Sequence, residues 1–151
     1  MASAACSGGG DPVPLNTPLT FDTATVVVGE GADTATLVVE LAESDAQRQY
    51  GLSRRSELDP GSGMLFVFDS LRAAEEGFWM WRTEVALDIA YIGPDGVISS
   101  VVAMDPCADA VYADACPEYP AEEPYLWALE TNQGWFQERG YGTGTSVRLE
   151  R

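Results

Sequence analysis

The sequence contains no histidine and no lysine. Without histidine, this chain cannot form a Ser-His-Asp triad, a Cys-His pair or a zinc site with histidine ligands. General acid–base chemistry is therefore left to aspartate, glutamate, tyrosine or cysteine. Long apolar runs are also missing. None approaches the roughly 18 residues that a membrane-spanning helix needs, so no transmembrane segment is predicted.

The charge of the chain is strongly unbalanced. It has 24 acidic residues against eight arginines, which gives a net charge of −16 at pH 7. A protein with this charge repels phosphate backbones and anionic lipid headgroups, so no nucleic-acid partner is predicted. An acidic surface of this kind favours salt (halophilic) adaptation, because high ionic strength screens the repulsion between carboxylates. The alternative is an acidic surface that serves solubility alone.

Residues 1–20 have the composition of a flexible tether, rich in glycine, proline and small residues and without periodicity. Within them, the sequence AACSG around Cys6 resembles the end of a bacterial lipoprotein signal, in which Cys6 would be lipidated and become the mature N-terminus. We therefore expect an extracytoplasmic protein, periplasmic or at the cell surface, that contacts the membrane only through a lipid anchor. A stray thiol in a tail is the alternative.

Residues 21–151 are predicted to form a single β-rich domain. Strands are expected over residues 21–28, 36–41, 64–68, 78–82, 87–92, 97–103, 125–130 and 146–149, separated by glycine, proline and aspartate turns. The apolar run MLFVF, residues 64–68, is expected to be a buried central strand. Short helices are expected over residues 45–50, with a capping box of Ser44 and Gln47, and over residues 134–139, capped by Thr131 or Asn132. The pattern indicates a mainly β fold, a compact jelly-roll-like β-sandwich or barrel with one or two short helices.

Five motifs along the chain carry a family resemblance. They read QYGLSRRSEL, GMLFVF, FWMWRT, LDIAYI and YLWALETNQGWFQERG. In order and spacing they resemble the prokaryotic family called domain of unknown function 192, over about residues 36–148. The resemblance implies a compact β-rich fold that is frequently exported or lipid-anchored, and it implies no established reaction, cofactor or partner. This chain departs from the family where Trp81-Arg82-Thr83 replaces the usual Lys-Asn-Thr, where Ser53-Arg54 replaces Met-Phe, and where Ala86 replaces a proline.

Two cysteines lie in an acidic, proline-containing loop over residues 105–124. Cys107 and Cys116 are nine positions apart, and we expect them to form a disulfide, as in an oxidising compartment. Two thiolates are too few for a metal site, and their spacing is not that of a CxxC redox pair. The carboxylates of this loop could bind a hard cation such as calcium, but they lack the spacing of a calcium loop. A solvated acidic loop is favoured, and no metal site is predicted.

The segment GFWMWRTEVALDIA, residues 77–90, holds four of the five candidate binding residues, and the fifth is Arg55. Strand alternation places Trp79 and Trp81 on one face, either packed in a core or exposed as an aromatic platform. Asp88 lies among apolar neighbours, so it must be paired, protonated or facing a cavity. Arg82 and Arg55 are its expected partners, in a structural ion pair or around a functional carboxylate. The predicted ligand-binding residues are Arg55, Trp79, Arg82, Thr83 and Asp88.

These observations predict a non-enzymatic module that binds a small ligand or an envelope protein, as a monomer and without a cofactor. One alternative is a hydrolase that acts on an envelope or glycan substrate with two carboxylates about 5–10 Å apart. Another is a purely structural accessory protein. No catalytic residue is assigned, because the sequence offers isolated acids and no recognisable catalytic set.

Overall fold

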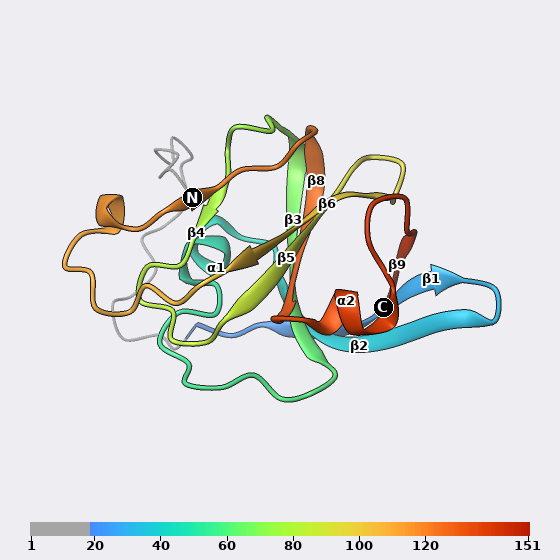
Figure 1. Cartoon of the computed structure of the whole chain (residues 1–151), viewed down its shortest axis with the longest axis horizontal. Helices are drawn as coiled ribbons and strands as arrows, with labels where there is room; N and C mark the ends of the chain where they lie inside the picture. The colour runs from blue at the N-terminus through green and yellow to red at the C-terminus, as the bar shows by residue number, and fades with distance from the viewer. Residues whose placement is uncertain (1–18) are drawn as a thin grey trace.

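The computed structural model describes residues 19–151, so the predictions for the tether and for Cys6 lie outside the described residues. The described chain contains a seven-stranded sheet and a two-stranded sheet (Figure 1). The strands are β1 (Asp22–Glu30), β2 (Asp33–Ala42), β3 (Ser62–Arg72), β4 (Phe78–Trp79), β5 (Leu87–Ile92), β6 (Ile98–Met104), β7 (Glu118–Tyr119), β8 (Tyr125–Asn132) and β9 (Val147–Glu150). Helices are α1 (Asp45–Tyr50) and α2 (Trp135–Arg139), with a 3₁₀ turn at Ala113–Ala115. The predicted mainly β class is confirmed.

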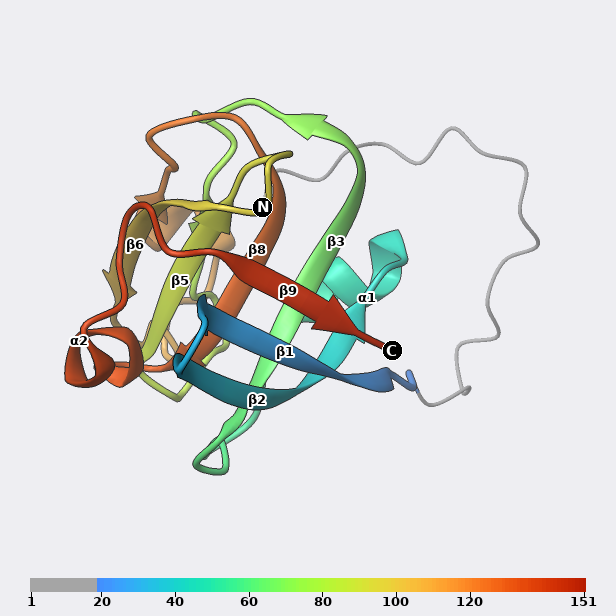
Figure 2. The same cartoon turned by 90° about the vertical axis from the view of Figure 1, so that its right-hand side faces the viewer.

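The large sheet has the strand order β6-β5-β8-β3-β2-β1-β9 and curls on itself (Figure 2). Only β2 and β3 are parallel; the other neighbours are antiparallel. Its two edge strands approach each other at one end, where Val97 and Ser146 form a bridge. There the amide of Ile98 donates a 2.8 Å hydrogen bond to the carbonyl oxygen of Thr145. The result is a partly closed sheet with an apolar cluster on each face.

Strand alternation divides the apolar side chains between these two clusters. Leu65 and Ala90 belong to the first cluster, whereas their chain neighbours Phe66 and Ile89 belong to the second. The run MLFVF forms the middle of β3 and is paired on both sides, as predicted. Helix α2 packs on the first cluster through its buried residues Trp135 and Phe136.

The second cluster is covered by α1, by the segments next to it, and by the small sheet of β4 and β7. Two buried tyrosines attach this cover to the large sheet. The hydroxyl of Tyr91 donates to the carbonyl oxygen of Tyr119 at 2.5 Å, and that of Tyr125 donates to the carbonyl oxygen of Glu76. The centroids of the two tyrosine rings lie 4.6 Å apart. Because each hydroxyl has a partner, these large side chains are buried without an unsatisfied polar group.

The local predictions differ from the structure at two places. Helix α1 begins at the predicted capping box of Ser44 and Gln47. Helix α2, however, follows a glycine in the left-handed conformation and has no side-chain cap, because β8 continues as far as Asn132. The predicted strand 78–82 is also too long: it ends at Trp79, and the backbone turns at Arg82, whose φ is 59°.

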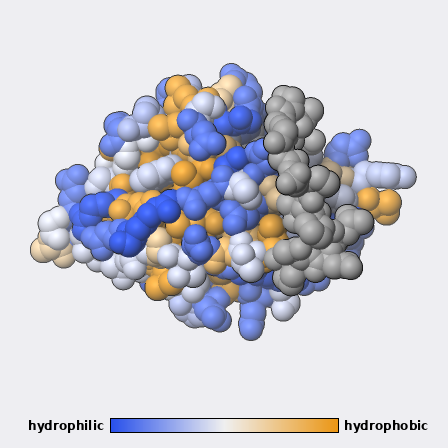
Figure 3. Space-filling model, turned by 180° about the vertical axis from the view of Figure 1, so that it is seen from behind, coloured by the Kyte–Doolittle hydropathy of each residue, from blue (hydrophilic) through white to orange (hydrophobic). Residues whose placement is uncertain are grey.

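On the face opposite to that of Figure 1, hydrophilic and apolar residues are interspersed (Figure 3). Within residues 19–151, no helix is both long and apolar enough to cross a membrane.

Candidate ligand-binding cleft

A cleft of about 440 Å³ opens on the second cluster, between the segment of residues 46–54 and the segment of residues 78–83. Glu130 of β8 is the acidic residue among its described lining residues, and we refer to this space as the Glu130 cleft. Its volume is in the range of sites that hold small organic molecules. Most of its wall is apolar and aromatic, formed by Leu52, Phe66, Phe78, Trp79, Met80 and Trp81.

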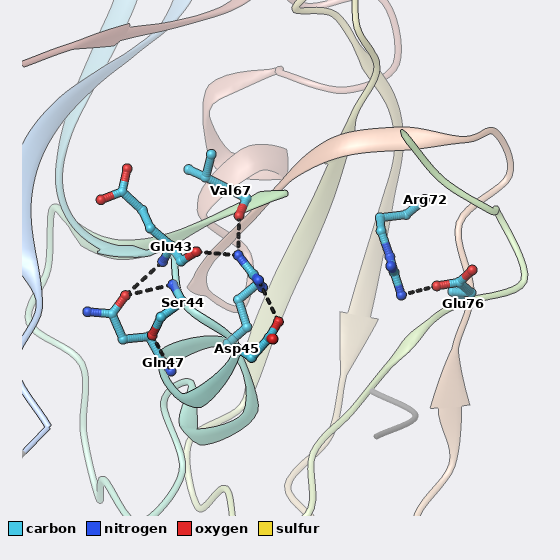
Figure 4. A network of polar contacts seen from close by, with 8 residues as sticks. Glu43, Ser44, Asp45, Gln47, Val67, Arg72 and Glu76 are labelled. Carbon is cyan, nitrogen blue, oxygen red and sulfur yellow. Dashed lines mark hydrogen bonds and ion pairs between the residues drawn. The ribbon is translucent and has the colours of Figure 1, made fainter. Parts of the chain in front are cut away.

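Helix α1 forms one side of the cleft, and Arg48 fixes its position. The Arg48 guanidinium donates hydrogen bonds to the carbonyl oxygens of Glu43 at 2.5 Å and Val67 at 2.7 Å, and to the carboxylate of Asp45 at 2.7 Å. Figure 4 shows these three partners around the start of the helix. Since Val67 belongs to β3, the same arginine ties the helix to the sheet. Arg48 is therefore committed to the fold.

The loop closed by the Cys107–Cys116 disulfide supports the opposite side of the Glu130 cleft, formed by residues 78–83. Cys107 and Cys116 are joined by a disulfide, with their Cα atoms 6.0 Å apart. The amide of Arg82 donates to the carbonyl oxygen of Cys107 at 3.2 Å, and the amide of Cys107 donates to the carbonyl oxygen of Thr83 at 3.3 Å. The indole of Trp81 adds a 3.0 Å hydrogen bond to a carbonyl of the same loop. The loop thus sets the position of three cleft residues.

Glu130 is the most unusual group in the cleft. Its side chain lies on the face of the second cluster, between the registered neighbours Met64 of β3 and Ile89 of β5. The residue is only 4% exposed, and within residues 19–151 its carboxyl makes no hydrogen bond or ion pair. Burial raises the pKa of Glu130 from 4.5 to about 8, because the charged form loses its hydration. At neutral pH the group is therefore mainly a neutral carboxylic acid, which can both donate and accept a hydrogen bond.

The arginines divide into two groups. Six of the eight form ion pairs with carboxylates in the described part of the chain. These six are Arg48, Arg55, Arg72, Arg139, Arg148 and Arg151. Arg54 and Arg82 form none among residues 19–151, and both line the Glu130 cleft. The guanidinium of Arg82 lies over the ring of Trp81, 4.1 Å from its centroid. In a chain with three times as many acids as arginines, the two unpaired cations lie at one site.

Arg54 and Arg82 also share an uncommon backbone conformation. They are the non-glycine residues with positive φ in the described chain, at 65° and 59°. The amide of Arg54 donates a 2.7 Å hydrogen bond to the carbonyl oxygen of Arg82. A left-handed conformation costs an ordinary L-residue roughly 1–2 kcal/mol. Such conformations concentrate where a structure positions functional groups.

The structure brings together three of the five predicted ligand-binding residues. Trp79, Arg82 and Thr83 all line the Glu130 cleft. Thr83 is buried, and its hydroxyl lies 3.4 Å from the carbonyl oxygen of Trp81 as a hydrogen-bond donor. The predicted alternation holds, because Phe78 and Met80 are buried in the second cluster while the two tryptophans are half-buried at the cleft.

Arg55 and Asp88 lie elsewhere, and the predicted ion pair of Asp88 with Arg82 or Arg55 is wrong. Arg55 forms a two-pronged pair with Glu40, at 2.5 and 3.0 Å, in a separate polar groove, and this hydrogen bond raises the pKa of Arg55. Asp88 is on the other face of β5 and accepts a 2.9 Å hydrogen bond from the amide of Gly134. Burial raises the pKa of Asp88, and that amide partly offsets the rise. Asp88 thus stabilises the turn into α2.

The sequence analysis missed Glu130. One signal was available: in β8 the residue lies on the same face as Ala128, which is buried in the second cluster. The carboxylates of residues 105–123 do not gather into a cation site, since no group of three or more potential metal ligands occurs in the described chain.

The fold and cleft define a class: a small, mainly β protein with an aromatic cleft over one face of a curled sheet. The chain belongs to the DUF192 family, described as "Uncharacterized ACR, COG1430", whose model matches residues 26–149.

Two solved structures are similar to this chain over nearly its whole length. One is from Sinorhizobium meliloti 1021 and is described as a candidate transcription regulator; it is 28% identical, with a TM-score of 0.76, and the match covers 88% of this chain and 98% of that one. The other is a protein of unknown function from Novosphingobium aromaticivorans DSM 12444, also 28% identical, with a TM-score of 0.70 and coverages of 91% and 94%. No curated protein matches the sequence.

Proposed function

We propose that this protein is a non-enzymatic binding module that holds a small organic ligand in the Glu130 cleft. The observation that carries the proposal is the Glu130 carboxyl, which is 4% exposed, lines the cleft and has no partner among residues 19–151. A buried polar group without a hydrogen bond costs roughly 1–3 kcal/mol. A ligand that hydrogen-bonds to this carboxyl would remove that cost, and the aromatic wall would bury its apolar part.

The alternative of a carboxylate-dependent hydrolase finds less support. Glycoside hydrolysis by the usual mechanism needs two carboxyl groups about 5–10 Å apart across one cleft. Glu130 is the acidic residue among the described lining of the cleft, and Asp88 lies on the opposite face of the sheet. A purely structural role, the third possibility, gives no reason for an open cleft lined by a buried acid that has no partner among residues 19–151.

The proposed location is extracytoplasmic, with a lipid anchor at Cys6 and an envelope protein as a further possible partner. The Cys107–Cys116 disulfide supports an oxidising compartment.

A DNA-binding role, as the description of the Sinorhizobium relative would suggest, is disfavoured because a net charge of −16 repels phosphate backbones. The same charge supports adaptation to high salt. We propose a monomer that functions without a cofactor.

Ligand-observed NMR with a library of small organic fragments tests the proposal. The matched variants are Ser53→Trp, which fills the cleft from its lining, and Ser56→Trp, which adds the same side chain at an exposed position outside the lining. We expect fragments that bind the wild type and Ser56→Trp but not Ser53→Trp. Equal binding to both variants would place the binding elsewhere, and a library without any hit would contradict the proposal.

A further inference from the structure

The charge at the mouth of the Glu130 cleft is opposite to that of the protein as a whole. The net charge is −16, yet the charged side chains that line the cleft are Arg48, Arg54, Arg82 and Glu130 within the described chain. Arg48 is neutralised by Asp45. Because burial raises the pKa of Glu130 to about 8, its carboxyl is mainly uncharged at neutral pH. Two unpaired positive charges therefore remain at this site.

We infer that the ligand of the Glu130 cleft is an organic oxyanion, a carboxylate or phosphate on an apolar body, whose charged group binds between Arg54 and Arg82. The inference rests on the proposed function and adds the chemical class of the ligand. In this arrangement the apolar body lies on the aromatic wall, and the neutral acid of Glu130 bonds to a polar group deeper in the cleft.

The two arginines are positioned by the backbone rather than by neighbouring acids. The 2.7 Å hydrogen bond from the Arg54 amide to the Arg82 carbonyl oxygen holds the two residues next to each other. The contact with the Trp81 ring orients the guanidinium of Arg82, while both arginines stay exposed to solvent. A guanidinium that has no ion pair can bind an incoming oxyanion without first losing a carboxylate partner. Arginine also fits the planar, two-oxygen geometry of carboxylates and phosphates.

Most of the chain would repel such a ligand. A surface with 24 acids and eight arginines lowers the local concentration of anions everywhere except near an unpaired cation. Among the arginines, only Arg54 and Arg82, both in the lining of this cleft, have no acidic partner in the described residues. A backbone hydrogen bond joins the two residues, so both side chains start from the same part of the cleft lining. The selection for an oxyanion therefore comes from this pair.

Isothermal titration calorimetry with matched probes tests the inference, at pH 6.5 and low salt. The probes are 1-naphthoate, 1-naphthyl phosphate and 1-naphthamide, which share an aromatic body and differ in the charged group. We expect the wild type to bind at least one of the two anions about tenfold or more tightly than the neutral amide, as charge-assisted hydrogen bonds are stronger than neutral ones. Which anion binds more tightly distinguishes a carboxylate ligand from a phosphate ligand.

The matched variants are Arg54→Asn and Arg82→Asn, because asparagine tolerates the left-handed backbone at both positions. We expect each to weaken anion binding about tenfold and to leave the amide unchanged. The control is Arg148→Asn, which makes the same charge change on β9, outside the cleft lining, and is expected to bind like the wild type. Equal binding of anion and amide, or equal losses in all three variants, would overturn the inference while leaving the proposed function intact. Failure of all three probes to bind also overturns it, and the fragment library then decides the proposed function separately.

Discussion

The amide of Arg54 donates a 2.7 Å hydrogen bond to the carbonyl oxygen of Arg82, and both residues have the left-handed backbone that L-residues seldom adopt. One contact thus joins the segment that follows helix α1 to the segment that follows β4, across the mouth of the Glu130 cleft. The two arginines differ in one respect. Arg82 lies against the ring of Trp81, whereas Arg54 makes no side-chain contact of this kind in the described chain.

This difference predicts the stability of two variants. Arg54→Asn should raise the free energy of unfolding by roughly 0.5–1 kcal/mol, because asparagine adopts the left-handed conformation more readily and no side-chain contact is lost. Arg82→Asn should be close to neutral, since its similar gain is offset by loss of a cation–π contact of about 0.5–1 kcal/mol. Urea unfolding curves measure both values. A clear loss of stability in Arg54→Asn would show that its side chain has a structural role.

Glu130 predicts a pH-dependent stability. Its pKa rises from 4.5 to about 8 on folding, so the folded state holds a proton that the unfolded state releases between these values. The contribution of Glu130 to the free energy of unfolding is therefore fully present below about pH 4.5. It is lost as the pH rises to about 8, and the total loss is up to about 5 kcal/mol. Glu130→Gln keeps the shape and cannot ionise. We expect the variant to match the wild type near pH 5 and to be the more stable protein at pH 8.5.

The measurement is urea unfolding of the wild type and Glu130→Gln at several pH values, with Glu138→Gln as the control at an exposed acid. This control reports what the same substitution does at an exposed position of α2. A constant difference between wild type and Glu130→Gln across pH 5–8.5 would mean that Glu130 is ionised in the folded protein and would contradict the neutral acid.

The disulfide predicts a link between the loop and the cleft. Cys107→Ser with Cys116→Ser opens a short loop and should lower the free energy of unfolding by roughly 2–3 kcal/mol. It should also weaken binding of 1-naphthoate, because the loop backbone holds Arg82 and Thr83. Urea unfolding measures the change in stability, and isothermal titration calorimetry measures the change in affinity. Unchanged affinity in a destabilised variant would show that the loop does not position the cleft.

Asp88 predicts a purely structural effect. Asp88→Ala removes the acceptor of the Gly134 amide and should cost about 1–3 kcal/mol of stability, whereas Asp88→Asn keeps an acceptor oxygen and should cost less. Neither variant should alter the affinity for a cleft ligand, since the side chain lies on the other face of the sheet. A loss of affinity in the folded Asp88→Asn protein would restore Asp88 as a binding residue.

The parts of the fold that depend on neighbouring residues could be predicted from the sequence. Alternation placed Trp79 and Trp81 on one face, the run MLFVF marked β3, and Ser44 with Gln47 marked the start of α1. The partner of Asp88 could not be predicted, because it is the backbone amide of Gly134, and a backbone group leaves no signal in the sequence.

The burial of Glu130 was hidden for a related reason. A glutamate is usually exposed even where it shares a strand face with an apolar residue, and here the cover comes from residues 46–54 and 78–83, far away in the sequence. The positive φ of Arg82 was hidden as well, since an arginine gives no indication of a left-handed turn.

The most direct test of the ligand site is the NMR signal of the four tryptophan indole groups. Trp79 and Trp81 line the Glu130 cleft, whereas Trp127 and Trp135 pack with the first cluster on the other face of the sheet. With the signals assigned by single Trp→Phe variants, titration of 1-naphthoate into ¹⁵N-labelled protein should shift the Trp79 and Trp81 indoles in a saturable way and leave Trp127 and Trp135 in place. Saturable shifts confined to Trp127 or Trp135, or no shift at any of the four, would contradict an oxyanion site in the cleft.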